Sequence, residues 1–162
     1  MIEEVRVEIG IPASTENIYP QKVVEVRPLV YPEVPVAAVR AAVTEKEFIM
    51  AMKIIKLSQK FDRKDELYAM TEHVKAVCDL YICANNYDSE VLSSYVKRVC
   101  KSRALDGRDA IKAAAKRVKA LEMNGGARGW FERSGQTSFL ARSRSIIEFI
   151  KEVEKIIEKI SL

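Results

Sequence analysis

All five prolines of this 162-residue chain lie within its first 35 residues. Proline removes a backbone donor and clashes with the preceding helical turn, so this part of the chain is not helical. Apolar residues alternate over Val5–Ile9, and Lys22–Val26 has the composition of a second short strand. We therefore expect residues 1–43 to form either a two-stranded β-ribbon joined by residues 12–20 or an extended arm that becomes ordered against a partner. Because a lone hairpin is only marginally stable in water, both alternatives require a docking surface.

From Thr44 onward the chain has no proline, and apolar residues recur at helical intervals. The pattern predicts a mainly α protein, in which an extended, proline-containing N-terminal arm (residues 1–43) precedes a bundle of about five helices (residues 44–162). The predicted helices cover about 44–61, a stretch from Asp62 to the turn at 84–90, a stretch from Asp88 or Ser89 to Asp106, about 108–123, and about 137–160.

Local residues mark several helix ends. Thr44 and Glu47 have the spacing of a capping box, in which each side chain accepts a hydrogen bond from the other residue's backbone N–H. Asp62 and Asp88 or Ser89 are suitable N-caps for the second and third helices. Asn124, Gly125 and Gly126 form a strong C-terminal stop for the fourth helix.

Apolar residues in the last predicted helix step by four and three positions. This seam consists of Ile146, Ile150, Val153, Ile157 and Ile160. Such a seam is typical either of a bundle helix or of an oligomer contact, and it covers only slightly more than two heptads. Residues 1–43 and the 146–160 seam are therefore the segments that we expect to contact a second copy or a paralogous subunit.

The net charge of +4 hides a concentration of positive charge in one segment. Residues 97–144 carry 13 basic and 4 acidic residues, a net charge of +9. Within this segment Arg108, Lys112, Lys116 and Lys119 follow one another at helical spacing and share one predicted face. Such a row attracts phosphates by its long-range field and by counterion release, without reading base sequence.

Residues 124–145 are rich in glycine and arginine and hold the only tryptophan of the chain. We expect a mobile loop in which Trp130 and Phe131 offer a stacking surface. The candidate nucleic-acid-binding residues are therefore Lys97, Arg98, Lys101, Arg108, Lys112, Lys116, Arg117, Lys119, Arg128, Trp130, Phe131, Arg133, Arg142 and Arg144. A solvated helix face, an acidic protein partner and a membrane surface remain alternative explanations of the basic residues, and the aromatic pair also suits attachment of the loop to the core.

The sequence offers little evidence of catalysis. The glycines at 125, 126, 129 and 135 fit neither a P-loop nor a dinucleotide-binding turn, and they follow a helix rather than a strand. His73 is the only histidine, and Cys78, Cys83 and Cys100 lack the spacing of a zinc site or a disulfide framework. We expect no catalytic site, no metal and no cofactor, although an enzyme with an unrecognised site stays possible.

The chain shows neither a secretory signal pattern nor an apolar run of the ~20 residues that a membrane helix needs. We therefore expect no membrane span and a cytoplasmic location, or a virion location if the protein is viral.

In its layout, a proline-bearing arm (residues 1–43) followed by a helical bundle with one basic side, the chain resembles the coat proteins of rod-shaped and filamentous archaeal viruses. The likeness covers the whole chain and involves no residue motif, so it assigns no site residue. The resemblance implies a DNA-wrapping structural protein whose arms pass between subunits. In those proteins much of the DNA-wrapping arm is helical, whereas here the basic residues lie in the bundle.

Two hypotheses follow. The first is a non-enzymatic, self-assembling structural protein that binds nucleic acid, double-stranded DNA more than RNA, through backbone phosphates. The second is a small helical subunit or adaptor of a larger complex, such as an RNA-guided defence effector or a transcription regulator, that binds RNA or a protein partner.

Overall fold

The computed structural model describes residues 21–26, 39–60, 66–133 and 145–162. Internal contacts divide the chain into two compact units, Met1–Val43 and Thr44–Leu162, which are described separately. The described part of the first unit consists of strand β1 (Gln21–Val26) and most of strand β2 (Val39–Thr44).

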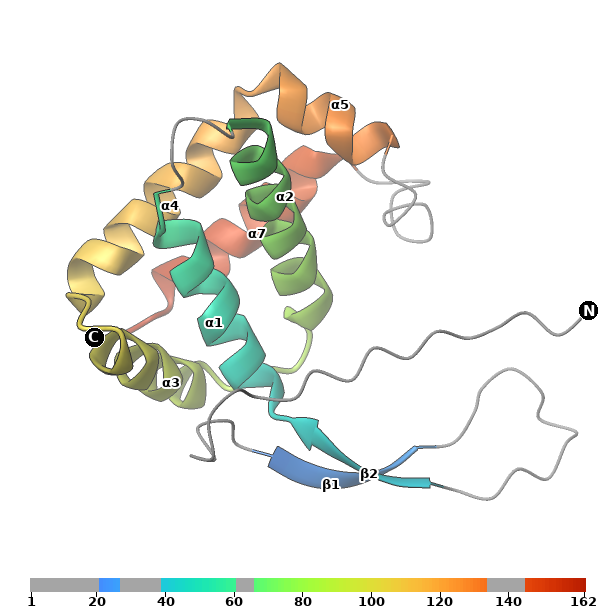
Figure 1. The fold of residues 1–162 in the computed structure, drawn as a ribbon, viewed down its shortest axis with the longest axis vertical. Helices are drawn as coiled ribbons and strands as arrows, with labels where there is room; N and C mark the ends of the chain where they lie inside the picture. Colours follow the sequence, from blue (N-terminus) through green and yellow to red (C-terminus); the bar gives the residue numbers. More distant parts are fainter. Residues whose placement is uncertain (1–20, 27–38, 61–65, 134–144) are drawn as a thin grey trace, which may run out of the picture. The chain divides into compact units, whose positions relative to one another are not determined.

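β1 and β2 form a two-stranded sheet (Figure 1). The predicted strand at Lys22–Val26 is confirmed, but its partner in the structure is β2, which was not predicted as a strand from the sequence. In β2 the residues Val39, Ala41 and Val43 alternate with Arg40, Ala42 and Thr44. Because Ala42 is also apolar, this alternation is weaker than that of Val5–Ile9. Residues 5–9, the predicted connection at 12–20 and the proline-rich stretch at 28–35 lie outside the described residues.

Among the described residues the second unit contains six helices, which confirms the predicted mainly α bundle. They are α1 (Lys46–Ser58), α2 (Glu66–Cys83), α3 (Ser89–Ser102), α4 (Gly107–Glu122), α5 (Gly125–Arg133) and α7 (Ile146–Glu158). α1 packs against α2, α3 and α4, whereas α7 packs against α4 and α2, and α5 lies across α2 and α4 (Figure 1). The central position of α1 explains its high content of apolar residues.

The core around α1 is mainly aliphatic, with Phe48 of α1 edge-to-face against Tyr95, and it is aromatic where α2, α5 and α7 meet. Ile54, Ile55 and Leu57 of α1 are fully buried. Phe149 of α7 lies against Tyr81, with ring centroids 3.9 Å apart, and edge-to-face against Phe131, with centroids 5.1 Å apart. Such aromatic pairs add to the stabilisation that burial of their area provides.

The seam of the last helix is part of this core. Ile146, Ile150, Val153 and Ile157 are at most 3 % exposed, and Ile160 is partly buried. This burial confirms the interpretation as a bundle helix. It corrects the expectation of an oligomer contact at 146–160, because the apolar residues that a second copy needs are covered by the chain's own helices. Residues 137–144, where the helix was predicted to begin, lie outside the described residues.

The predicted capping box at the start of α1 is wrong. Thr44 ends β2, and the N-cap is Glu45, whose side chain makes no capping hydrogen bond. Glu45 and Glu47 instead contact α3 and its N-cap. The Glu45 carboxylate accepts a hydrogen bond from the Tyr95 hydroxyl at 2.6 Å, and the Glu47 carboxylate accepts one from the Asp88 backbone N–H at 3.2 Å. Tertiary hydrogen bonds have therefore replaced the local ones.

Other predicted helix ends are confirmed. The Asp88 carboxylate caps α3 by accepting from the backbone N–H groups of Glu90 and Val91 at 2.8 and 3.1 Å. The predicted break at Asp106 is confirmed, and the structure adds a cap that was not predicted, because the Asp106 carboxylate accepts from the Asp109 N–H at 2.9 Å. α4 ends at Glu122, before the predicted stop.

The expected mobile loop at 124–145 is partly helical, since α5 occupies Gly125–Arg133. The Asn124 side chain accepts a hydrogen bond from the Ala127 N–H at 3.0 Å, so the residue predicted to stop α4 instead caps α5. Ala127 and Phe131, four residues apart, are buried on the same face of the helix. Phe131 is therefore a core residue, and its assignment to a nucleic-acid-stacking surface is corrected.

Candidate nucleic-acid interface

The α4 basic row, defined as Arg108, Lys112, Lys116 and Lys119, lies on the exposed side of α4, and all four residues are exposed. At 100° per residue these four positions fall within an arc of about 80°. Ala110, Ala114, Val118 and Leu121 are buried on the opposite side. Burial of the small apolar face therefore orients the cationic face outward.

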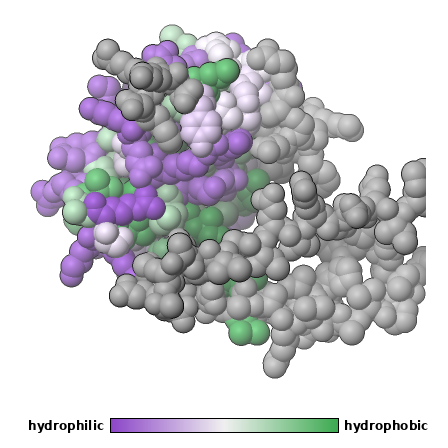
Figure 2. Space-filling model, in the orientation of Figure 1, coloured by the Kyte–Doolittle hydropathy of each residue, from purple (hydrophilic) through white to green (hydrophobic). Residues whose placement is uncertain are grey.

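α3 adds a second group of exposed cations. Lys97, Arg98 and Lys101 are exposed, whereas Leu92, Val96 and Val99 of the same helix are buried. α3 packs directly against α4. Figure 2 shows hydrophilic residues gathered along the side of the bundle on which α4 lies.

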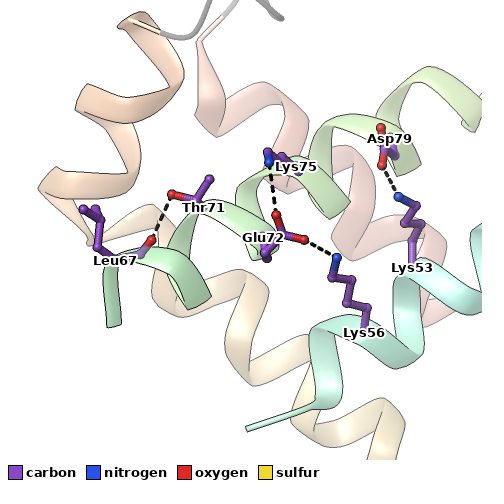
Figure 3. A network of polar contacts seen from close by, with 7 residues as sticks. All are labelled: Lys53, Lys56, Leu67, Thr71, Glu72, Lys75 and Asp79. Atoms are coloured by element: carbon purple, nitrogen blue, oxygen red, sulfur yellow. Dashed lines mark hydrogen bonds and ion pairs between the residues drawn. The ribbon is translucent and has the colours of Figure 1, made fainter. Parts of the chain in front are cut away.

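The basic residues of the bundle differ in whether they are neutralised. On α1 and α2, Lys53 pairs with Asp79 at 2.5 Å, and both Lys56 and Lys75 pair with Glu72 (Figure 3). In the described part of the chain, no basic residue of α3 or α4 forms an ion pair. The positive charge of α3 and α4 is therefore available to an external anion.

A hollow of about 480 Å³ lies beside α3 and the C-terminal end of the chain. Lys97 and Lys159 line it together with the hydroxyl-bearing residues Ser89, Ser93, Ser94 and Ser161, and with Glu90. Hydroxyl and ammonium groups are common phosphate contacts in protein–DNA complexes. Lys97 was expected from the sequence, whereas Lys159 and the serines were not, because only the fold brings residues 159–161 next to α3.

The structure separates the other predicted binding residues. Arg128 is exposed on α5, Arg117 is half-buried, and Trp130 is half-buried against the core. The side chain of Arg133 and residues Arg142 and Arg144 lie outside the described part of the structure. The predicted aromatic pair is thus divided, with Phe131 facing inward and only Trp130 accessible at the surface.

His73, the only histidine, is 2 % exposed on α2. Burial and the nearby Arg117 guanidinium lower the pKa of its imidazole to about 4. His73 is therefore neutral at physiological pH and occupies the position of a core residue.

The three cysteines carry no free thiolate. Burial raises the pKa of each of the Cys78, Cys83 and Cys100 thiols, that of Cys78 to about 12. Within the described residues no group of three or more histidine, cysteine or acidic side chains is arranged to hold a metal ion. None of the helices in this part of the chain combines the length and apolar composition of a bilayer-spanning segment.

Comparison with family models, curated proteins and solved structures finds no match to this chain. The resemblance to viral coat proteins therefore rests on the layout of the sequence alone.

Proposed function

We propose that this chain is a non-enzymatic structural protein that assembles along double-stranded DNA and contacts the backbone phosphates, as a viral coat protein or nucleoprotein does. The observation that supports this most strongly is the α4 basic row, which is exposed and makes no ion pair among the described residues. A polyanion that neutralises this row replaces mobile counterions, and their release favours binding.

The length of the row suits a nucleic-acid backbone. Arg108 and Lys119 are eleven residues apart on α4, which corresponds to roughly 16 Å along the helix axis at 1.5 Å per residue. Because each DNA strand winds around the duplex axis while α4 is straight, the row can contact only a few successive phosphates of one strand. Three of its four members are lysines, which act as point charges toward phosphate and favour backbone contact over base readout.

Assembly is assigned to residues 1–43. The 146–160 seam is buried within the bundle, which leaves the N-terminal unit as the proposed contact with a second copy. We expect the intact chain to form higher-order complexes on DNA, measured by light scattering, and a chain of residues 44–162 to bind DNA as single copies. Circular dichroism of the shortened chain checks that the helices remain. Equal complex sizes for both chains refute this assignment.

A matched pair of variants tests the phosphate contact. Lys112, Lys116 and Lys119 are changed to alanine in one chain, and the exposed Lys60, Lys151 and Lys155 in the other. Both changes remove three positive charges. Because exposed ion pairs are worth about 0.2–1 kcal/mol each, we expect the first variant to bind duplex DNA roughly tenfold more weakly than the control at equal salt. Equal affinities contradict the assignment of the α4 basic row.

The adaptor hypothesis makes a different prediction for the same surface. The hollow lined by Lys97, Lys159 and serine hydroxyls is equally suited to RNA phosphates. The two hypotheses are distinguished by a competition assay, in which unlabelled RNA and DNA duplexes of equal length displace a labelled DNA duplex from the protein. Stronger competition by RNA favours the adaptor and contradicts the DNA coat.

A further inference from the structure

A second pocket lies on the face of the bundle formed by α1, α2 and α5. It has a volume of about 280 Å³, just below the range of about 300–1,000 Å³ that is typical of small-molecule sites. The ion-pair network of Figure 3 forms its polar wall, and Trp130, Ile82 and Cys78 form its less polar wall. None of the α4 basic row lines this pocket, so it is separate from the proposed DNA contact.

The polar wall carries one positive charge in excess. Lys53, Lys56 and Lys75 face two carboxylates, and the Glu72 carboxylate is shared by Lys56 and by Lys75, the latter at 3.1 Å. Hydrogen bonds from these two ammonium groups hold the pKa of Glu72 below its ordinary value, so this carboxylate stays ionised at neutral pH. Two ammonium groups that share one carboxylate retain donor capacity for a further anion.

The lysines are partly shielded from water. The exposed fractions of the Lys53, Lys56 and Lys75 side chains are 32, 33 and 39 %. An anion held among them meets a weaker dielectric response than it does at the exposed lysines of α4, and it also lies near the carboxylates of Glu72 and Asp79. The one ammonium group in excess over these carboxylates lets the pocket accept a compact anionic group such as a phosphate.

The less polar wall suits a planar ring. Trp130 is partly buried and packs against the core, which fixes the indole at the pocket. Ile82, which is 58 % exposed, adds aliphatic surface to this wall. The Cys78 thiol, whose pKa burial raises to about 12, is neutral and adds apolar surface. Stacking on tryptophan accepts any nucleobase, since every base has a π-face.

From this juxtaposition of an indole with three partly shielded lysines, we infer that the pocket binds an aromatic ring bearing a phosphate, a single nucleotide unit. The ring stacks on Trp130 and the phosphate accepts hydrogen bonds from Lys75 and its neighbours. The volume limits the ligand to one nucleotide. Its source is either a free nucleotide or the phosphorylated end of a nucleic-acid strand, and binding involves no covalent step.

The single tryptophan provides a direct assay, because all tryptophan fluorescence of the chain arises beside the pocket. We expect AMP to quench this fluorescence to a saturating limit, and adenosine or inorganic phosphate alone to bind more weakly. Linear quenching by AMP, equal to that of a free tryptophan derivative, overturns the inference. Isothermal titration calorimetry with AMP provides a second readout, and absence of heat together with linear quenching likewise overturns it.

Lys75→Ala is the informative variant. Lys75 is the most exposed of the three lysines, and its loss leaves the Lys56–Glu72 pair in place. Loss of one charge-assisted hydrogen bond predicts about tenfold weaker AMP binding. Lys151→Ala on α7 is the matched control and leaves AMP binding unchanged. Equal affinities of the two variants refute the phosphate contact.

Two DNA probes distinguish the sources. A short duplex with 5′-phosphates is compared with the same duplex without them, in the background of the Lys112/Lys116/Lys119→Ala variant. Displacement of AMP by the phosphorylated duplex alone identifies a strand end as the ligand, whereas displacement by neither identifies a free nucleotide. Both results support the pocket. Equal displacement by both duplexes contradicts recognition of a terminal phosphate and refutes the inferred ligand. The pocket does not depend on the proposed DNA contact. Saturable AMP binding therefore supports the pocket even if duplex DNA does not bind to the α4 basic row.

Discussion

Stability at mildly acidic pH is set by the buried His73. Its imidazole is 2 % exposed and has a pKa of about 4, against an ordinary value of 6.5, because burial and the nearby Arg117 disfavour the imidazolium. As the pH falls below 6.5, the unfolded chain takes up a proton that the folded chain does not. The free energy of unfolding therefore decreases from pH 6.5 downward, levels off near pH 4, and is independent of this group above pH 6.5.

The size of the effect follows from the same shift. Each pH unit between the two pKa values changes the free energy of unfolding by about 1.4 kcal/mol, so the loss between pH 6.5 and pH 5.0 is about 2 kcal/mol. Glu72 contributes in a different window. Its pKa is lowered from 4.5, so the stability gained from its lysine partners is lost only below that pH. Between pH 5.0 and 6.5 the change in the free energy of unfolding therefore reports on His73 and not on Glu72.

Urea unfolding at pH 6.5 and 5.0 measures this loss. The intact chain is expected to lose about 2 kcal/mol between the two conditions, at an unchanged denaturant dependence. His73→Gln cannot titrate, so it loses almost nothing over the same range, although it is less stable at both pH values. Arg117→Gln removes the repulsion and gives a loss between the two. Equal losses of stability in the intact chain and in His73→Gln refute this role of the imidazole.

Three further substitutions test individual contacts by urea unfolding at pH 7. Asp88→Ala removes the cap of α3 and destabilises by about 1 kcal/mol; Asp88→Asn is the control, and equal losses contradict the capping role. Phe149→Ala removes the ring that contacts Tyr81 and Phe131 and lowers the free energy of unfolding by about 3–5 kcal/mol. A loss under ~1 kcal/mol contradicts the burial of Phe149 between these rings. Gly125→Ala meets no atom within 4 Å and stabilises by about 0.4–1 kcal/mol, in contrast to Gly126→Ala, whose Cβ meets Met70 Sδ at 3.2 Å. A destabilised Gly125→Ala contradicts the described start of α5.

The helices were predictable because their determinants are local. Period and proline placement predicted the bundle, and Asp88 and Asp106 cap helices through atoms two or three residues away. Glu47 was misjudged because its partner is the backbone of Asp88, 41 residues along the chain. No local pattern reveals such a partner.

The candidate binding residues were likewise predicted correctly where local sequence determines their position and wrongly where tertiary contacts do. The α4 basic row is a property of one helix, so its exposure followed from its spacing. Phe131 was misplaced because nearby glycines and arginines indicated a loop, whereas Asn124 caps a short helix that turns Phe131 inward. The pocket beside Trp130 was missed, since the Lys53–Asp79 and Lys56–Glu72 pairs join two helices whose adjacency only the fold reveals.

The most direct test of the central claim is a salt titration of duplex DNA binding, followed by fluorescence anisotropy. The logarithm of the affinity of the intact chain should fall steeply with the logarithm of salt concentration. The Lys112/Lys116/Lys119→Ala variant should show a slope smaller by about 2.7, at ~0.9 per lost phosphate contact, and the Lys60/Lys151/Lys155→Ala control should keep the full slope. No binding of the intact chain at ~50 mM salt, or equal slopes in both variants, contradicts phosphate contact by the α4 basic row.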